Sequence, residues 1–538
     1  MVVDLVFKNG QVITVNSTDE VVEAVAIKSN KIVALGSNDE IESLISSTTK
    51  VIDLKGKSLL PGFVDAHCHI TMYGTSQLSF NCREIDSIED LIIGLKESAK
   101  RTSSGQWIRA VGFNETKVKE KRYPTRWELD DISTEHPIMV TRACGHICIV
   151  NSQALEMVGY GKSTPDPKGG EIRRDKQGIP TGVLVEEANM AMSVVASFSK
   201  KELEKALEIA SKDYIEAGIT SLHDAGGMGP ENFQILQKSV ESGIVKQRVY
   251  TMLCSVHEAK TSLGNLLQSG VVTGLGNEKY KIGPAKLFID GSSSGPTVST
   301  RKPYSSDYEN FGILYLTQEE LDEALIPAHE QGFQITAHAQ GDRAIEMLLN
   351  TIEKALELYP RENHRHRIEH AGISMPDLVE RMKELNVIPI PNPPFPYEYG
   401  DIYMNHYGDR VNYMYPLRDF IDNGVIAAGA SDSPVTDYKP LLGIHVAVNR
   451  KNQIGEPVGL NQRVTVLEAI RAYTYNGAYA SFEEDIKGSI EIGKLADFVI
   501  IGGNLLDTPK DQIKDLDVDM TVVDGEIVYE KKSVSELV

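Results

Sequence analysis

The chain has 538 residues, of which 41% are hydrophobic and 24% charged, and its formal net charge at pH 7 is −21. This length exceeds what one ordinary hydrophobic core supports, so we expect more than one folding unit. The acidic balance disfavours nucleic acid and anionic membrane surfaces as partners, because both attract basic patches. Residues 1–8 lack the basic opening and the long apolar stretch of a signal peptide, so we expect a cytoplasmic protein.

Short strands and turns are predicted at both ends of the chain. The N-terminal strand-like runs are residues 4–8, 11–15, 22–27, 31–35 and 51–53, and the C-terminal ones are residues 498–502, 521–523 and 526–529. Chain termini usually lie close together at the surface of a domain. We therefore predict one small β-sandwich domain built from residues 1–60 and 481–538.

The middle of the chain alternates short β-branched or apolar runs with longer amphipathic helical patterns. The eight runs are residues 63–69, 219–224, 248–254, 285–290, 334–338, 367–370, 387–391 and 425–432. This alternation is typical of βα units and a parallel sheet, and eight such units close a TIM barrel. We predict an α/β fold with a (β/α)8 barrel over residues 61–480. The gap between the first two runs is too long for one unit, so residues 75–200, approximately, are predicted to form an inserted lobe.

Two histidines mark the end of the first predicted barrel strand. His67 and His69 are two residues apart, so both side chains point to the same face of a strand. At the carboxyl end of a barrel strand, residues on the inner face lie in the catalytic region. Two imidazoles that converge from one backbone suit a divalent metal. The alternative is a pair of core histidines whose rings are hydrogen-bonded.

Four more polar residues lie on other predicted barrel strands. His338 ends the fifth run, His370 ends the sixth and Asp432 ends the eighth, whereas Lys286 lies at the start of the fourth. Polar residues at the carboxyl ends of barrel strands converge on one point. Each residue alone has an ordinary structural explanation, but their joint placement favours a metal centre.

This constellation resembles the amidohydrolase superfamily, which has an HxH pair on the first strand, a lysine on the fourth, a histidine on each of the fifth and sixth, and an aspartate on the eighth. The resemblance also includes residues 51–53, 59–69 and 487–497. More narrowly, the chain resembles the YtcJ-like branch, which includes N-substituted formamide deformylases. The segments that carry this narrower resemblance are residues 145–147, 151–155, 181–184 with Glu186, 286–295 with Arg301, and 337–344.

The resemblance implies a cofactor of two divalent metal ions, with zinc best suited to imidazole and carboxylate ligands, although manganese, cobalt or iron would also fit. The implied ligands are His67, His69 and Asp432 for the first ion, His338 and His370 for the second, and an N-carboxylated Lys286 as a bridge. An ammonium group cannot bind a cation, whereas a carbamate is an anionic donor with two oxygens. The alternative is that Lys286 stays an ordinary cation and one metal binds alone.

The resemblance also implies a binuclear hydrolase that acts on carbon–nitrogen bonds other than peptide bonds, such as a small-molecule amide or an N-substituted formamide. A hydroxide that bridges the metals would attack the carbonyl. Asp432, as the general base, would take a proton and deliver it to the leaving nitrogen. A homodimer is expected from the habit of the family.

Four residues are candidates for catalysis or substrate contact, and three of them have a structural alternative. His146 would donate a hydrogen bond to the carbonyl or would support a turn, and His223 would orient a metal ligand. Arg301 would hold an anionic substrate group or merely a loop. Phe395 would line an apolar pocket or belong to a core.

Two other functions compete with amide hydrolysis, because fold does not decide chemistry. A deaminase or an esterase would use similar ligands on the same scaffold. Deaminases of this superfamily usually use one metal and have no bridging lysine, so the presence of Lys286 disfavours them. A non-catalytic regulatory relative is disfavoured because none of the expected ligands is missing.

Overall fold

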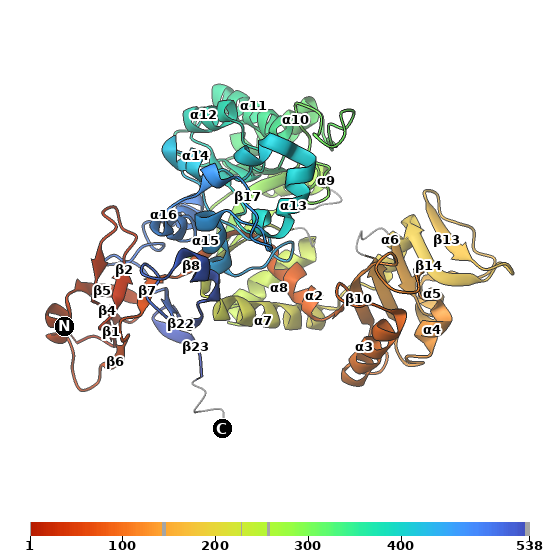
Figure 1. Cartoon of the computed structure of the whole chain (residues 1–538), viewed down its shortest axis with the longest axis horizontal. Coiled ribbons are helices and arrows are strands. Elements are labelled where there is room, and N and C mark those ends of the chain that lie inside the picture. The colour runs from red at the N-terminus through yellow and green to blue at the C-terminus, as the bar shows by residue number, and fades with distance from the viewer. Residues whose placement is uncertain (1, 143–146, 227–228, 255–258, 533–538) are drawn as a thin grey trace. The chain divides into compact units, whose positions relative to one another are not determined.

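The computed structural model describes residues 2–142, 147–226, 229–254 and 259–532. The chain forms two compact units, one made of Met1–Ile70 with Ala210–Val538 and the other of Thr71–Ile209 (Figure 1). Each unit is described by itself below. Within the described residues, no helix has the length and apolar character needed to span a membrane.

The larger unit contains a sheet of parallel strands in the order β20-β19-β18-β17-β16-β15-β8. The strands are β8 (Phe63–Cys68), β15 (Ile219–Asp224), β16 (Arg248–Leu253), β17 (Tyr280–Phe288), β18 (Ile335–Ala339), β19 (Arg367–His370) and β20 (Ile388–Ile390). Each matches one of the predicted runs, although β17 begins five residues before the predicted start at residue 285. The predicted α/β barrel fold is confirmed.

The eighth predicted run, residues 425–432, is not a regular strand in the structure. It nevertheless lies between β20 and β8, because the Ala428 N–H donates to the Pro389 carbonyl at 3.2 Å and the Asp432 N–H donates to the His67 carbonyl at 2.8 Å. The φ of Asp432 is 59°, which takes the backbone out of the extended conformation at the end of the run. The segment therefore closes the barrel with scattered hydrogen bonds instead of a continuous ladder.

Helices follow the barrel strands in alternation, as the βα pattern predicts. They are α7 (Lys200–Glu216), α8 (Pro230–Glu241), α9 (Ala259–Ser269), α10 (Gln318–Glu330), α11 (Asp342–Leu358), α12 (Pro376–Glu384), α13 (Phe395–Tyr407), α14 (Leu417–Asp422), α15 (Pro440–Asn449), α16 (Val466–Ala472) and α17 (Tyr475–Ala480). Helices α10, α11 and α12 lie side by side (Figure 1). The apolar face of α11 buries Ile345, Leu348 and Ile352, which is the periodicity expected for a helix packed on a barrel.

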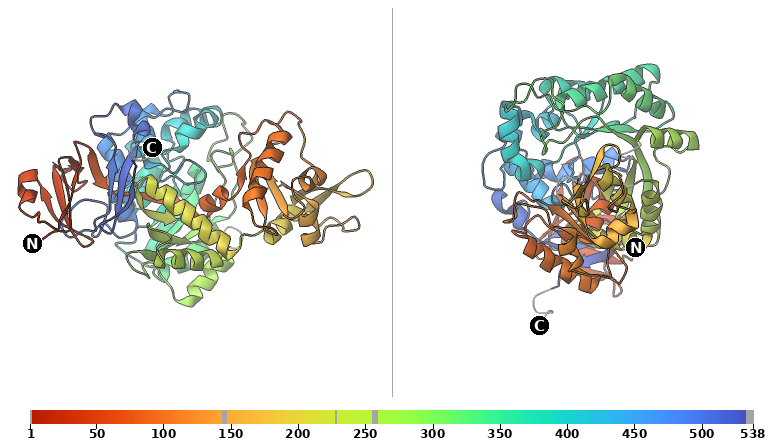
Figure 2. Two further views of the ribbon diagram at one scale, coloured as in Figure 1. Left: turned by 90° about the horizontal axis from the view of Figure 1, so that it is seen from below. Right: turned by 90° about the vertical axis from the view of Figure 1, so that its right-hand side faces the viewer.

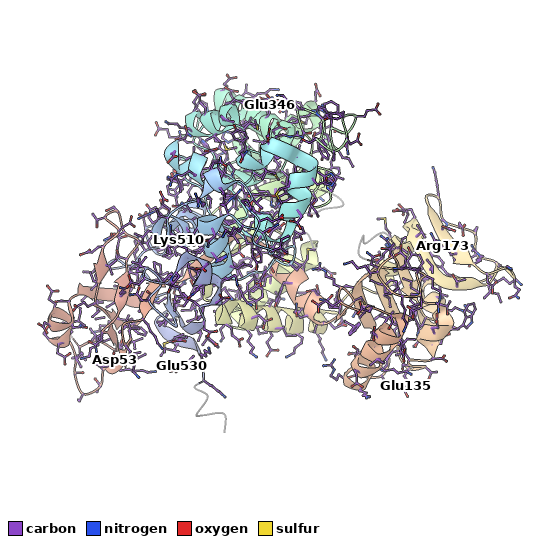
Figure 3. All side chains as sticks on the ribbon, in the orientation of Figure 1. Asp53, Glu135, Arg173, Glu346, Lys510 and Glu530 are labelled. Carbon is purple, nitrogen blue, oxygen red and sulfur yellow. The ribbon has the colours of Figure 1, made fainter. Side chains whose placement is uncertain are left out.

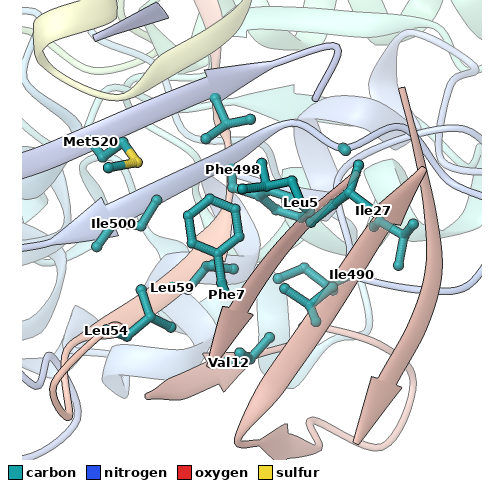
Figure 4. Close-up of a cluster of buried hydrophobic side chains, with 14 residues drawn as sticks. Leu5, Phe7, Val12, Ile27, Leu54, Leu59, Ile490, Phe498, Ile500 and Met520 are labelled. Atoms are coloured by element: carbon teal, nitrogen blue, oxygen red, sulfur yellow. The ribbon is translucent and has the colours of Figure 1, made fainter. Parts of the chain in front are cut away.

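This unit has two further sheets: β5-β4-β1-β6 consists of N-terminal strands alone, whereas β23-β22-β21-β7-β2-β3 contains strands from both ends of the chain. Their strands are β1 (Leu5–Lys8), β2 (Gln11–Ile13), β3 (Val21–Val22), β4 (Ala24–Lys28), β5 (Lys31–Gly36), β6 (Lys50–Asp53), β7 (Ser58–Pro61), β21 (Phe498–Ile501), β22 (Val518–Val523) and β23 (Glu526–Glu530). Strand β7 pairs with β21, so the two ends share one sheet (Figure 2). Phe7 and Phe498 pack edge to face in the common core, with ring centroids 6.1 Å apart (Figure 4).

The smaller unit is a mixed sheet in the order β13-β14-β12-β11-β10-β9 with helices around it. Its elements are α2 (Ile70–Gln77), β9 (Phe80–Asn81), α3 (Ile88–Arg101), β10 (Ile108–Phe113), α4 (Arg126–Asp130), β11 (Ile138–Arg142), β12 (Ile147–Val150), α5 (Ser152–Val158), β13 (Gly170–Arg174), β14 (Pro180–Glu186) and α6 (Glu187–Val195). Neighbouring residues enter different apolar clusters, with Val140 and Ile149 in one and Met139 and Cys148 in the other. Both faces of the sheet are therefore covered. The lobe predicted for residues 75–200 falls within this unit, whereas the domain boundaries at residues 60 and 481 stay a prediction.

Candidate metal centre

The barrel brings together the six residues that were proposed as metal ligands. His67 lies in β8, Lys286 in β17, His338 in β18 and His370 in β19, and His69 and Asp432 follow the first and last segments of the ring. The ring centroids of His67 and His370 are 4.7 Å apart, and those of His338 and His370 are 4.5 Å apart. Side chains more than two hundred residues apart in the sequence therefore meet at the carboxyl end of the barrel.

The tightest group contains one ligand atom from each of His67, His370 and Asp432, and these atoms all lie within 4.8 Å of one another. Oδ1 of Asp432 also lies 3.3 Å from Nε2 of His69 and 3.5 Å from Nε2 of His67. This group includes members of both predicted ligand sets. Such a geometry fits one divalent ion, and it also fits a pair of closely spaced ions.

Each of the four imidazoles is oriented by a hydrogen bond from one ring nitrogen. The acceptors are the Glu369 carboxylate for Nδ1 of His67, the Gly226 carbonyl for Nδ1 of His69 at 2.8 Å, the Gly291 carbonyl for Nε2 of His338 at 2.9 Å, and Oδ1 of Asn392 for Nδ1 of His370 at 2.8 Å. A neutral imidazole carries one N–H and one lone pair. Since the acceptor fixes the N–H, the lone pair of each ring resides on its other nitrogen, where a metal can bind.

Burial keeps three of these rings neutral. It lowers the pKa of His338 to about 4, and it lowers the pKa of His67 and of His370 well below the usual value. The neighbouring Lys286 lowers the pKa of His67 further. Metal binding needs an unprotonated imidazole, so these rings are ready to bind at neutral pH.

Asp432 and Lys286 complete the donor set. Burial alone would raise the pKa of Asp432, but electrostatic interactions with the neighbouring His370, His69 and Lys286 outweigh burial, and the pKa is lowered. Lys286 is fully buried, and its Nζ lies 3.2 Å from Nε2 of His67. Burial lowers the pKa of Lys286, which favours a neutral amine. Nitrogen lone pairs, an ionised carboxylate and a modifiable amine fit a divalent metal of the zinc type.

Comparison with known proteins supports the same chemistry, because residues 50–529 match the model of the Amidohydrolase family. The chain belongs to this family. The YtcJ protein of Bacillus subtilis is 30% identical over 535 residues, which cover 98% of this chain and 99% of that protein. An N-substituted formamide deformylase of Arthrobacter pascens is 28% identical over 540 residues, which cover 98% of each chain.

A solved structure agrees with the family assignment. An uncharacterized metal-dependent hydrolase from Pyrococcus horikoshii superposes with a TM-score of 0.78 at 26% identity, covering 94% of this chain and 99% of that one. Membership of the amidohydrolase family therefore implies hydrolase activity and a divalent metal, and the donor set described above fits both.

In this amidohydrolase family member, two charged residues that were not predicted as site residues support His67. Glu369 accepts a hydrogen bond from His67, and it also accepts from Nε and Nη2 of Arg367 at 2.8 and 3.0 Å and from Oγ1 of Thr336 at 2.8 Å. Arg367 and Glu369 alternate with Ile368 in β19. The sequence contained a signal for this pair, because two charged residues lie two positions apart in a strand that is predicted to be buried. Charged residues are rarely buried unless they are paired with a partner.

His223, predicted to orient a metal ligand, contacts Arg367 of this pair. Nη1 of Arg367 donates to Nδ1 of His223 at 2.9 Å, and Nη2 of Arg367 donates to the Ala66 carbonyl at 2.7 Å. Burial, followed by the charge of Arg367, lowers the pKa of His223 well below its usual value. His223 therefore holds the guanidinium that in turn holds Glu369.

Arg301 and Phe395, predicted as substrate residues, make contacts that fit their structural alternatives, and their roles stay predictions. Nη1 of Arg301 donates to Asp377 at 2.6 Å, and Nη2 donates to Glu346 at 2.9 Å. Glu346 lies on α11 and is labelled in Figure 3. These contacts attach a loop to two helices. Phe395 is fully buried in an aromatic cluster, and its ring lies nearly parallel to His370 at a centroid distance of 6.3 Å. His146, predicted as catalytic, lies outside the described residues.

Proposed function

We propose that the protein hydrolyses the C–N bond of a small-molecule amide, such as an N-substituted formamide, with the help of two divalent cations, of which zinc suits the donors best. The observation that carries this proposal is the convergence of four oriented imidazoles with Asp432 and the buried Lys286. The similarity to an N-substituted formamide deformylase supports the reaction class.

The proposed ligands divide into two sets. The His67 set is His67, His69 and Asp432, and the His338 set is His338 and His370. Lys286 would be N-carboxylated and bridge the two sets, because its lowered pKa increases the fraction of neutral amine, which can bond to the carbon of CO2 and lose a proton. When bound, divalent cations acidify water and polarise a carbonyl.

Asp432 is the proposed general base. Four other buried carboxylates near the site are already used as acceptors: Glu369 by side chains, Asp65 by the Ser431 and His67 backbone N–H groups, Asp290 by three backbone N–H groups, and Asp224 by the Thr251 hydroxyl. Asp432 takes the proton of the attacking water at a carboxylate oxygen and delivers it to the leaving nitrogen. This delivery matters because an amine leaves poorly unless it is protonated.

Amine release tests the proposal. The protein is loaded with zinc in bicarbonate and screened against N-formyl, N-acetyl and N-aryl amides, simple esters and amino heterocycles. Turnover of an amide is expected, and Asp432→Asn should lower kcat by about 10²- to 10⁴-fold. The matched control is Asp437→Asn, because Asp437 pairs with Lys439 and not with a proposed ligand. Turnover of esters alone, or release of ammonia from a heterocycle, would identify a different reaction on the same scaffold.

A further inference from the structure

The four proposed histidine ligands differ in the group that accepts the hydrogen bond of the ring N–H. His69, His338 and His370 donate to neutral oxygens, namely two backbone carbonyls and the Asn392 amide. The Asp290 carboxylate lies 3.7 Å from Nε2 of His338, which is beyond hydrogen-bond distance. Among the hydrogen bonds of the described residues, His67 is the one of the four whose orienting acceptor is a carboxylate, that of Glu369. A charge-assisted hydrogen bond is roughly twice as strong as a neutral one. The His67 set and the His338 set are therefore not equivalent.

Glu369 is fixed in place by its own contacts. Arg367 holds it with two hydrogen bonds and Thr336 with a third, and the side chains of Arg367 and Glu369 are both fully buried. His67 supplies the fourth donor. A carboxylate with four donors has no role left as a base, so its contribution to the site is to position His67.

The contact crosses the interior of the barrel. His67 lies in β8 and Glu369 in β19, and 302 residues separate them in the sequence. The Nδ1–H of His67 is directed at Glu369, and this leaves Nε2 facing Asp432 at 3.5 Å. An anionic acceptor also makes the opposite ring nitrogen a better metal donor, and loss of such a partner typically lowers metal affinity by about 10- to 100-fold.

We propose that Glu369, held by Arg367, is a positioning residue that makes the His67 set the tighter of the two cation positions, so that the protein loads its two cations in sequence with the His67 set first. This inference rests on the two-cation function proposed above. It identifies Glu369 as a determinant of metal affinity that does not touch the metal.

A metal titration tests this order without any assay of activity. Metal-free protein in bicarbonate is titrated with Co²⁺, and binding is followed by visible absorption and by calorimetry. The wild type should bind two ions in two resolved steps. Glu369→Gln keeps the shape of the side chain and removes its charge, so the first step should weaken by about 10- to 100-fold while the second stays unchanged. Thr336→Val, the control, removes one support of Glu369 but keeps its contact with His67, and should leave the first step within about threefold.

A converse variant guards against a fold defect in Glu369→Gln. Asn392→Asp places a carboxylate behind His370 while the Arg367–Glu369 pair stays intact, and it should strengthen the second step. If both variants bind two ions, and if the first step is unchanged in Glu369→Gln and the second step is unchanged in Asn392→Asp, the proposed role of Glu369 is overturned. The two-cation function would stand in that case. A wild type that binds one ion per chain would overturn the two-cation function and the loading order with it.

Discussion

Asp65 and Ser431 join the first barrel strand to the segment that closes the ring. The Ser431 backbone N–H donates to Oδ1 of Asp65 at 3.0 Å, and its hydroxyl donates to Oδ2 at 2.5 Å. The same carboxylate accepts the backbone N–H of His67 at 3.2 Å. Because Asp432 follows Ser431 directly, this buried carboxylate holds His67 and Asp432 together, along with the hydrogen bond from the Asp432 N–H to the His67 carbonyl.

Asp65→Ala should therefore destabilise the protein. The substitution leaves three buried donors without an acceptor, and each such loss costs about 1–3 kcal/mol. We expect the free energy of unfolding to fall by about 3 kcal/mol or more, measured by chemical denaturation. Ser431→Ala, which removes the hydroxyl donor to Asp65 and the acceptor of the Ser433 backbone N–H, should cost less, about 1–2 kcal/mol. A similar small loss in both variants would show that the carboxylate does not organise this junction.

Lys286 should carry a carbamate in the metal-loaded protein. With ¹³C-labelled bicarbonate, a carbamate carbon signal is expected in the NMR spectrum of the wild type, because burial lowers the pKa of the amine and so increases its neutral, reactive fraction. The signal should be absent in Lys286→Ala and present in Lys281→Ala, which changes a lysine of the same strand that pairs with Glu483. A metal-loaded wild type without the signal would contradict N-carboxylation.

Removal of metal should lower thermal stability. Chelation leaves the converged donors of His67, His370 and Asp432 without the cation that they fit. A ligand at 100 times its dissociation constant stabilises the folded state by about 2.7 kcal/mol, so added zinc should raise the melting temperature by several degrees. Magnesium prefers oxygen ligands and should give a much smaller shift, and equal effects of the two ions would argue against this site.

Arg301→Gln should separate a structural role from substrate binding. Arg301 pairs with Glu346 and Asp377, and exposed ion pairs of this kind contribute about 0–1 kcal/mol. We expect a small decrease in melting temperature with KM unchanged once a substrate is known. A tenfold or larger rise in KM, about 1.4 kcal/mol of lost binding, would instead restore Arg301 as a residue that holds the substrate.

Three buried histidines outside the proposed ligand sets should make the fold sensitive to acid. Nε2 of His366 donates to Nδ1 of His329 at 2.8 Å, while Nδ1 of His366 accepts the Ile335 N–H at 3.0 Å. Arg361 also donates to His329. Burial lowers the pKa of His364 to about 4, that of His366 well below its usual value, and that of His329 as well.

The direction of this pH dependence follows from linkage. An unfolded histidine titrates near pH 6.5, so below that pH the unfolded state binds more protons than the folded state. The stability contributed by the neutral rings is therefore complete above about pH 6.5 and is lost as the pH falls towards 4. His366→Gln should flatten this slope of unfolding free energy against pH, whereas His406→Gln, outside the cluster, should not. Identical slopes in wild type and His366→Gln would exclude the cluster as the cause.

The local pattern of the sequence was sufficient to predict the barrel and the positions of its proposed histidine ligands. The spacing of His67 and His69 places both on one face of a strand, and His338 and His370 end predicted strands that the structure contains. Both inferences depend on the period of a strand and on where strands end, which are properties of short segments. The resemblance to a family added the roles of Lys286 and Asp432, and these roles stay proposals.

Partners across the barrel were not predictable in this way. Glu369 meets His67, and Ser431 meets Asp65, only because ring closure brings together strands that lie more than three hundred residues apart. The sequence left Arg301 and Phe395 with two roles each, and only the structure gave their contacts, which are with α11 and α12 for Arg301 and with a buried cluster for Phe395. A sequence therefore determines what each segment can present on one face, whereas the side chain that meets that face depends on how the whole chain folds.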